Sequence, residues 1–311
     1  RSYCCMEITF LGTGAGMPSK ERNVSALVLN LLHEINELWL FDCGEATQHQ
    51  ILKTTLKPRK ITKIFITHLH GDHIFGLPGL LSSRSFLDGD ERVTIYGPKG
   101  IKQFVETSLH ISKTHLTYPL EFVELEEEGI VFENERFIIH NKILDHNILS
   151  FGYRVTEKDQ LGELLVDKLI ALGVKPGPIY KTIKENEQTT LEDGTVINRK
   201  DVLGPPKKGK VISIFGDTRY KQAYASFIQG SDLLVHEATF DRTKRDLARQ
   251  YYHTTAYDAA KLAKEAKVKQ LILTHISSRY QYDGVKQLLK EAQSIFKSTK
   301  IANDLYTFSL K

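Results

Sequence analysis

In the first third of the chain, short apolar runs take turns with stretches in which apolar residues recur every three to four positions. This pattern predicts a mixed α/β protein. Short apolar runs, many closing on Gly, Asp or His, are typical of buried strands. They cover Ile8–Thr13, Ala26–Leu32, Leu38–Cys43, Ile64–His68 and Val93–Gly97. Between them, apolar residues at three- to four-residue spacing predict helices that cover one face of a sheet. These helices are expected over Ala46–Leu56, Leu80–Leu87 and Ile101–Leu109.

The rest of the chain first changes style and then returns to it. After Leu120, four runs suggest an antiparallel meander: Glu121–Leu125, Ile130–Phe132, Arg136–Ile143 and Phe151–Val155. Later strands are expected over Val211–Gly216, Leu233–Glu237, Leu271–His275 and Leu305–Leu310. A helix capped by Thr254 or Thr255 and another over Gly284–Phe296 fill two of the gaps. Elements mixed in this order favour an α/β fold of two packed sheets with helices outside, a four-layer αββα sandwich.

Residues 156–210 interrupt this pattern and are expected to contribute little core. They contain Lys175-Pro176-Gly177-Pro178, a polar stretch over Lys184–Gly194, and a Gly-, Pro- and Lys-rich end at Gly204–Lys210. One interpretation is a tolerated surface insertion. The other is a protruding arm that contacts a polyanion through basic side chains, and composition does not choose between the two. The basic candidates are Arg199, Lys200, Lys207, Lys208 and Lys210.

Composition and charge narrow the class of protein only a little. The 311 residues are 41% hydrophobic and 26% charged, which is ordinary globular usage. A net charge of +4 permits a polyanionic partner without requiring one. No apolar run approaches the roughly 20 residues that span a bilayer, so no membrane partner is expected and the chain reads as soluble and cytoplasmic. Residues 1–5, before Met6, are expected to be an extension outside the fold, leaving 6–311 as the folded domain.

The strongest chemical signal is the segment Thr67–His73, because His68, His70, Asp72 and His73 follow a buried-looking strand within six residues. Packing four such groups together would be costly without a cation. The alternation of the first two histidines and the turn at Gly71 suggest two adjacent metal sites. Only three cysteines occur, at positions 4, 5 and 43, so the ligands must be histidine and carboxylate.

Two metals need more ligands than this segment supplies, because a catalytic zinc typically takes three protein ligands. His146, Asp217 and His275 each come where a strand is expected to end, and strand ends at one edge of a sheet converge in space. Taken alone, each is as consistent with a cap or a solvated group. His110, His115 and His140 are expected to be such ordinary groups.

The HxHxDH segment with Asp217 and His275 resembles the metallo-β-lactamase superfamily, whose fold is the αββα sandwich. Further segments resemble one family within it, ribonuclease Z, the tRNA 3′-processing endonuclease. They are Gly12-Thr13-Gly14, Pro18-x-Lys20-x-Arg22-Asn23, Phe41-Asp42-Cys43-Gly44-Glu45, His236-Glu237-Ala238-Thr239 and His253-Thr254-Thr255. The resemblance runs from Ile8 to about Tyr280. It implies a zinc-dependent endoribonuclease that removes the 3′ trailer from precursor tRNA, cutting near the discriminator base and leaving a 3′-hydroxyl.

The resemblance also implies a role for each site residue, with two zinc ions per subunit. One zinc would be held by His68, His70 and His146, the other by Asp72, His73 and His275, with Asp217 bridging both. The nucleophile would be a hydroxide that bridges the metals, with Asp72 as its general base. His253 would protonate the leaving 3′ oxygen, and Glu237 would hold and charge that imidazole. His236 and Asp42 are expected to have structural roles.

RNA contacts are implied at two places. Lys20, Arg22 and Asn23 belong to the segment expected to meet RNA phosphate or the 3′-terminal nucleotides. The insertion over 156–210 falls where the family carries its flexible arm for tRNA binding, which makes Lys207, Lys208 and Lys210 further candidates. The resemblance to short members of this family implies a homodimer, in which the arm of one subunit would bind tRNA at the active site of the other.

Two alternatives remain open at this stage. The first is another hydrolase on the same fold, acting on a β-lactam, a thioester, a sulfate ester or a DNA end. The arm and the segments around Glu237 and His253 argue against it, because a small substrate needs no arm. The second is a catalytically silent, metal-stabilised RNA-binding protein, and the presence of Asp72, Glu237 and His253 argues against it.

Overall fold

The computed structural model of the chain describes residues 6–311, so the extension expected over residues 1–5 lies outside the described residues. Contacts divide the chain into two compact units. The described residues up to Val155 together with Val211–Lys311 form the first, and Thr156–Lys210 form the second. Each unit has its own hydrophobic core, and the candidate metal ligands all belong to the first.

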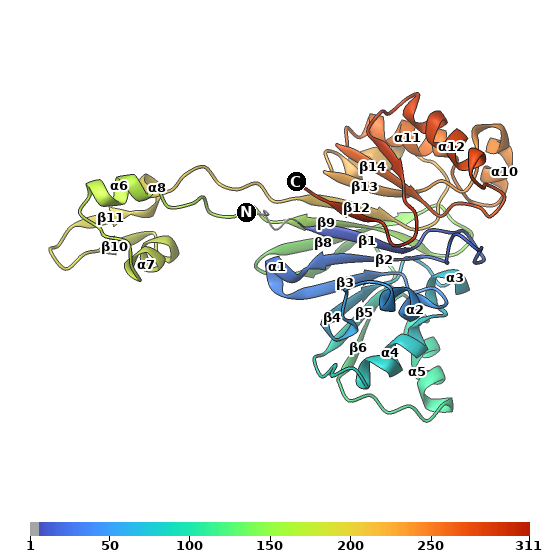
Figure 1. Cartoon of the computed structure of the whole chain (residues 1–311), viewed down its shortest axis with the longest axis horizontal. Coiled ribbons are helices and arrows are strands. Elements are labelled where there is room, and N and C mark those ends of the chain that lie inside the picture. Colours follow the sequence, from blue (N-terminus) through green and yellow to red (C-terminus); the bar gives the residue numbers. More distant parts are fainter. Residues whose placement is uncertain (1–5) are drawn as a thin grey trace. The chain divides into compact units, whose positions relative to one another are not determined.

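Two seven-stranded sheets form the centre of the first unit (Figure 1). In spatial order, the first sheet consists of β16 (Thr307–Ser309), β1 (Glu7–Gly12), β2 (Ala26–Leu31), β3 (Glu37–Phe41), β4 (Ile61–Phe65), β5 (Val93–Pro98) and β6 (Leu120–Leu125). The second consists of β15 (Thr299–Ile301), β14 (Gln270–Thr274), β13 (Leu233–Glu237), β12 (Val211–Phe215), β9 (Ser150–Glu157), β8 (Phe137–Leu144) and β7 (Gly129–Glu133). The strands β3 to β6 are parallel, as are β12 to β15.

Helices cover the outer face of each sheet, which completes four layers (Figure 1). On the side of the first sheet lie α2 (Thr47–Leu52), α4 (Leu77–Ser85) and α5 (Ile101–Ile111), and on the side of the second lie α11 (Ala256–Glu265) and α12 (Asp283–Gln293). The remaining short elements are α1 (Leu32–Ile35), η1 (Pro58–Lys60), α3 (Gly71–Ile74), η2 (Gln222–Tyr224), α9 (Ala225–Ile228), η3 (Arg242–Lys244) and α10 (Arg245–Gln250). The αββα sandwich expected from the sequence is confirmed.

The core between the sheets is rich in buried aromatic side chains. Trp39, Phe41 and Phe65 of the first sheet pack in one cluster with Phe151 and Tyr153 of the second. Burying each such side chain stabilises the fold by about 1.5–3 kcal/mol. Successive side chains of a strand point to opposite faces of its sheet. One face of each sheet therefore packs in this central layer, and the other face packs against the helices in a separate cluster. A rigid double sheet therefore supports the loops at its edge.

Most expected strands lie within a few residues of their observed bounds, but the meander expected after Leu120 is wrong in its first strand. The strand β6 pairs in parallel with β5 in the first sheet, and only β7, β8 and β9 continue into the second sheet. The chain crosses between sheets in the short loop after Leu125. The strands on either side of this loop, β6 and β7, are short and mixed in polarity, so their sequence pattern does not reveal which sheet each of them joins.

The second unit is a small α/β module with a core of its own. It contains α6 (Val166–Ala171), α7 (Ile179–Glu185), β10 (Gln188–Thr190), β11 (Val196–Asn198) and α8 (Arg199–Val202). Leu169, Val174, Ile183, Ile197 and Val202 are buried together. The expectation that this segment contributes little core is therefore wrong. Its few apolar residues are far apart in the sequence and form a cluster only when the β10–β11 hairpin folds back.

Candidate metal centre and active site

The candidate ligands lie in loops that follow strand ends. The chain leaves β4 at Phe65 and carries His68 and His70 in the following loop, and Asp72 and His73 stand in α3. The other three follow the second sheet: His146 comes after β8, Asp217 after β12 and His275 after β14. The strands β4, β12 and β14 lie in the parallel parts of their sheets, and parallel strands present their carboxyl ends at one edge, where the loops that follow them meet.

Seven residues converge into two groups that share one carboxylate. The first group is His68, His70, His146 and Asp217, and the second is Asp72, His73, Asp217 and His275. Within each group one possible ligand atom from every residue lies within 4.8 Å of the others. All the ligands expected from the sequence are thus brought together, and none lies elsewhere in the fold. The groups could hold two metal ions side by side.

Hydrogen bonds outside the ligand group orient the ring of His68. The Oδ2 atom of Asp42 accepts the hydroxyl proton of Thr67 at 2.8 Å, and that hydroxyl oxygen lies 2.9 Å from Nδ1 of His68. Since the hydroxyl has only one proton and gives it to the carboxylate, Nδ1 of His68 must donate. The Nε2 atom of His68 is then left unprotonated, with a lone pair toward the group.

The same logic applies to three more rings. His73 donates from Nδ1 to Asp42 at 2.7 Å. His146 donates from Nδ1 to the carbonyl oxygen of Tyr252 at 3.0 Å, in a loop where Tyr252 has a φ of 61°. His275 donates from Nδ1 to Thr239 at 2.9 Å, because the Thr239 hydroxyl donates to Glu237. Each ring therefore presents Nε2 as its metal-ligating atom, as outer contacts of metal-bound histidines commonly arrange.

The donor set fits divalent cations. The Nε2 atoms of His68 and His73 are buried and have no hydrogen-bond partner, and they lie 3.5 Å from Asp217 oxygens. Burial lowers the pKa of His146 to about 4, which keeps that imidazole in the neutral form that binds metal. Burial favours a neutral Asp72, but the adjacent His73 and His275 lower the pKa of Asp72 below its usual range. Although burial opposes a charge on His73, three carboxylates, Asp217, Asp42 and Asp72, raise its pKa well above the usual value. Buried ring nitrogens without a hydrogen-bond partner, set among carboxylates, are what a cation would satisfy.

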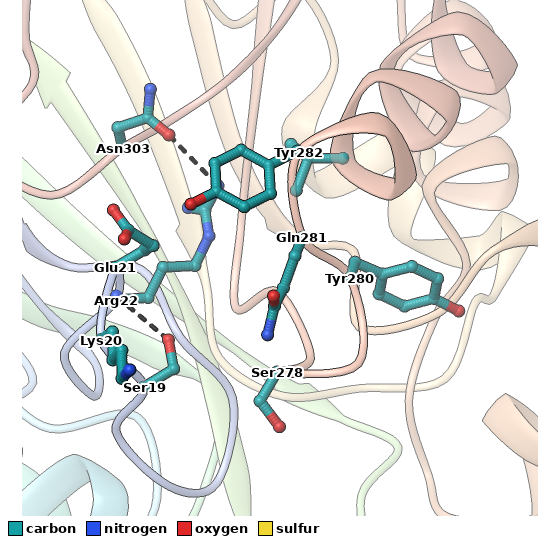
Figure 2. Close-up of a pocket in the computed structure, with 10 residues that line it drawn as sticks. Ser19, Lys20, Glu21, Arg22, Ser278, Tyr280, Gln281, Tyr282 and Asn303 are labelled. Atoms are coloured by element: carbon teal, nitrogen blue, oxygen red, sulfur yellow. Dashed lines mark hydrogen bonds between the residues drawn. The ribbon is translucent and has the colours of Figure 1, made fainter.

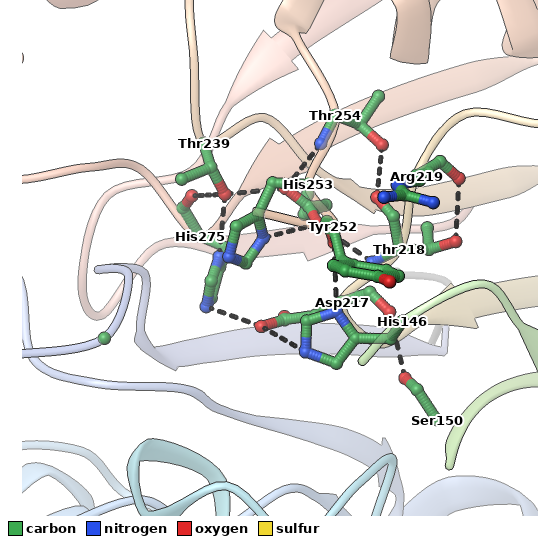
Figure 3. Close-up of polar contacts among 12 residues, drawn as sticks. His146, Ser150, Asp217, Thr218, Arg219, Thr239, Tyr252, His253, Thr254 and His275 are labelled. Carbon is green, nitrogen blue, oxygen red and sulfur yellow. Dashed lines mark hydrogen bonds and ion pairs between the residues drawn. The ribbon is translucent and has the colours of Figure 1, made fainter. Parts of the chain in front are cut away.

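Glu237 and His253 form a polar pair, and the ring of His253 lies beside that of His275 from the second group (Figure 3). Nδ1 of His253 donates to Oε1 of Glu237 at 2.9 Å. The buried carboxylate also accepts the backbone N–H groups of Thr218 and Thr254 and the hydroxyl of Thr239. Burial opposes protonation of His253, yet the charge of Glu237 and this hydrogen bond raise its pKa to about 9. His253 is therefore held as a proton donor with Nε2 free.

Lys20, Arg22 and Asn23 have different surroundings, and Figure 2 shows the first two. Lys20 is exposed at a cavity of about 570 Å³ that also contains Tyr280 and Tyr282. Arg22 is buried and donates to the hydroxyl of Thr13, to the carbonyl of Ala302 and to the side chain of Asn303. The Asn23 amide donates to the Glu45 carbonyl. Of the three, only Lys20 keeps its charged group open to a ligand.

Several orienting residues were not expected from the sequence. Thr67 stands one residue before His68, and this spacing is a usable signal. Thr239 lies 36 residues from His275, and Tyr252 lies 106 residues from His146, so only the fold reveals those contacts. Asp42, expected to have a structural role, accepts hydrogen bonds from Thr67 and His73. His236 is buried against Phe215 and does not reach either group.

Comparisons with known proteins now decide the family. A protein from Oceanobacillus iheyensis named Ribonuclease Z is 61% identical over 306 residues, covering 98% of this chain and 100% of that protein. One from Bacillus mycoides with the same name is 60% identical over the same length. The chain belongs to the ribonuclease Z family. As a member of this family, the chain is a nuclease. A family model described as Anti-Pycsar protein Apyc1 also matches residues 6–131.

Solved structures agree with the assignment to ribonuclease Z. The short form of human tRNase Z superposes with a TM-score of 0.70 at 31% identity, covering 98% of this chain and 100% of the human one. The metallo-β-lactamase fold protein YhfI from Bacillus subtilis has a TM-score of 0.68 at 20% identity, which shows the shared fold alone. Within residues 6–311, none of the helices has the length and apolarity needed to cross a membrane.

Proposed function

We propose that this chain is a zinc-dependent endoribonuclease that removes the 3′ trailer from precursor tRNA. It cuts near the discriminator base and leaves a 3′-hydroxyl on the tRNA. The observation that carries the proposal is the position of His253. A ring nitrogen of His253 lies within 4.8 Å of His275, which belongs to the second metal group, and of Glu237. The raised pKa of His253 makes it a charged proton donor. An unactivated ribose leaving group needs such an acid, whereas the p-nitrophenolate of an activated phosphate ester leaves without a proton.

The residues that would hold the metals follow from the two groups. His68, His70 and His146 would bind one zinc, Asp72, His73 and His275 the other, and Asp217 would contact both. Two zinc ions bound there would lower the pKa of a bound water and neutralise negative charge on the phosphodiester. Nitrogen and carboxylate donors without a thiolate are consistent with zinc in a catalytic site.

The chain's own groups would then handle the protons. Asp72 would accept a proton from the water that attacks phosphorus. As the new phosphorus–oxygen bond forms, the bond to the ribose O3′ breaks, and His253 would give its Nε2 proton to that oxygen. Glu237 would keep the His253 ring oriented and charged until the transfer. The products are a tRNA with a 3′-hydroxyl and a trailer with a 5′-phosphate.

Replacing Glu237 with glutamine should slow precursor tRNA cleavage by roughly 10- to 100-fold, the usual size of losing an orienting partner. The amide keeps the shape of the carboxylate but removes the charge that raises the pKa of His253. Single-turnover rates on tRNA and on bis(p-nitrophenyl) phosphate measure the effect. The dye ester releases a good leaving group and should lose little. An equal loss on both substrates would contradict the role of Glu237.

Substrate binding is assigned to Lys20 and to the arm over 156–210. Lys207 and Lys208 are exposed, and Lys208 pairs with Asp159 at 2.6 Å. Changing Lys207, Lys208 and Lys210 together to glutamine should weaken tRNA affinity and flatten its dependence on salt, because phosphate contacts release counterions. Filter binding at several salt concentrations measures both. An unchanged slope would remove these lysines from the RNA contact.

We further propose a cytoplasmic homodimer, in which each arm serves the active site of the other subunit. Mixing a subunit that lacks residues 156–210 with a full-length subunit carrying Asp217→Ala tests this arrangement. Neither parent should process tRNA well, whereas the mixed dimer should regain activity. If mixing restores nothing while light scattering shows mixed dimers, the arm acts within its own subunit.

A substrate panel tests the proposed function against its alternatives. The zinc-loaded protein is incubated with a precursor tRNA that carries a 3′ trailer, with bis(p-nitrophenyl) phosphate and with a β-lactam. Endonucleolytic cutting of the tRNA is expected. If the tRNA stays intact while the β-lactam is hydrolysed, the chain is a different hydrolase on this fold. If nothing is cut but tRNA binds, it is a silent RNA-binding protein.

A further inference from the structure

A shallow cavity of about 450 Å³ borders the candidate metal centre on the side of His70 and Asp72. Two of its lining side chains are large, apolar and open to solvent, since Met17 is 62% exposed and Phe75 is 64% exposed. Most large apolar side chains in this unit lie in the cores between and outside the sheets. Apolar faces left open at the rim of an active site indicate a binding surface.

The position of Phe75 is set by its neighbours. A β-carbon placed on Gly71 would lie 2.2 Å from the ring atom Cε2 of Phe75, so the ring rests directly on the glycine backbone. Only glycine permits this approach. One side of the ring is therefore covered by the loop that carries the metal ligands, and the ring still leaves most of its surface to solvent. Phe75 thus offers an open ring face in the same cavity wall as Asp72.

The loop that carries Met17 is equally well anchored. The N–H of Gly14 donates to the carbonyl of Asn23, and the N–H of Ala15 donates to the carbonyl of Ile276, directly after His275. One residue before Met17, the N–H of Gly16 donates to Oδ2 of Asp72 at 3.0 Å. The loop thus joins the metal centre by backbone hydrogen bonds, and Met17 and Phe75 are both held beside the same carboxylate.

The charge of the cavity argues against a phosphate as occupant. Among the described residues that line it there is no lysine or arginine, and the exposed carboxylate of Glu45 lies at its wall. A neutral, flat group fits better. Because His70 and Asp72 form part of the wall, a group bound there lies next to the metal centre, where a part of its substrate would lie. A nucleobase meets both conditions.

We propose that Phe75 and Met17 form a stacking site for the nucleobase of a nucleotide that flanks the scissile phosphodiester. This inference rests on the proposed ribonuclease function. Stacking of a base on an aromatic ring tolerates every base, because each has a π-face. The methionine thioether adapts to bases of different size. The site would hold the RNA strand in register across the metals without reading its sequence.

A substrate-and-variant cycle tests the site. The value of kcat/KM is measured for the full-length protein and for Phe75→Ala on a precursor tRNA with a 3′ trailer. The same tRNA is then made abasic at the discriminator or at the first trailer nucleotide. On the intact tRNA the variant should lose on the order of tenfold, the size of one base stack. On one of the abasic substrates the native protein should lose a similar factor, and Phe75→Ala should lose nothing more.

Two further comparisons separate stacking from a general disturbance. Phe75→Trp should keep cleavage near the native rate, whereas Phe75→Leu should behave like alanine, and both should keep the native zinc content. Phe86, which is 86% exposed at the end of α4, provides the matched control. Phe86→Ala should cut the intact tRNA as fast as the native protein does.

The outcomes distinguish the two proposals. Two results in a native protein that cuts tRNA would overturn the stacking site alone: Phe75→Ala as fast as the native protein on intact tRNA, or slower than the native protein by the same factor on intact and on abasic tRNA. Loss of zinc in Phe75→Ala and Phe75→Leu would assign Phe75 to the support of the metal loop and also overturn the site. A native protein that never cuts tRNA would overturn the proposed function and the stacking site with it.

Discussion

Replacing His253 with alanine should slow precursor tRNA cleavage by roughly 10²- to 10⁴-fold, the range expected for a lost general acid. The ribose O3′ is a poor leaving group, and no other described side chain bound to Glu237 offers a comparable ring proton. Hydrolysis of bis(p-nitrophenyl) phosphate should change only a few-fold, because p-nitrophenolate leaves without a proton. Single-turnover rates on both substrates give the ratio directly.

The control for this variant is His110→Ala. His110 is exposed on α5 and lies in neither metal group. It should keep both activities. Thermal unfolding and zinc content of His253→Ala should match those of the native protein, since His253 is not among the proposed ligands. Equal losses on the tRNA and on the dye ester would remove His253 from the protonation step.

Replacing Asp217 with alanine should abolish both activities, with losses of roughly 10³-fold or more, because several kcal/mol of metal-ion stabilisation disappear. Asp217 is buried and is the one residue common to the two groups among the described candidates. Its removal therefore damages both sites at once. Metal analysis after gel filtration should find far fewer than two zinc ions per subunit.

The matched control replaces an aspartate that faces solvent. Asp283 has a side chain that is 96% exposed at the start of α12 and belongs to no metal group. Asp283→Ala should retain two zinc ions and native rates. If Asp217→Ala keeps its zinc and its rate on the dye ester, the two-metal arrangement around Asp217 is wrong.

The sequence predicted the fold well because buried strands and amphipathic helices carry strong periodic signals. The run Leu233–Glu237 matches β13 at both ends, and Thr255 caps α11 with a hydrogen bond from the Asp258 N–H. The sequence indicates less clearly which strands pair with one another. The residues of β6 do not indicate that it pairs with β5 rather than with the strands that follow it.

The site was predicted in composition but not in its supporting contacts. Density within one loop identified His68 to His73, and resemblance to ribonuclease Z supplied the distant ligands. The hydrogen bonds that orient the rings join residues far apart in the chain, as Thr239 does for His275. Arg22 looks in sequence like a surface cation, yet burial makes it a structural anchor. Such roles depend on packing, which periodicity does not encode.

The most direct test of the central claim is cleavage of a precursor tRNA in water enriched in ¹⁸O, with both products analysed by mass spectrometry. Attack of water on phosphorus with departure of O3′ predicts one ¹⁸O atom in the 5′-phosphate of the trailer. The tRNA should end at or near its discriminator base with an unlabelled 3′-hydroxyl. A 2′,3′-cyclic phosphate or a 3′-phosphate on the tRNA, or a tRNA left uncut, would contradict the account.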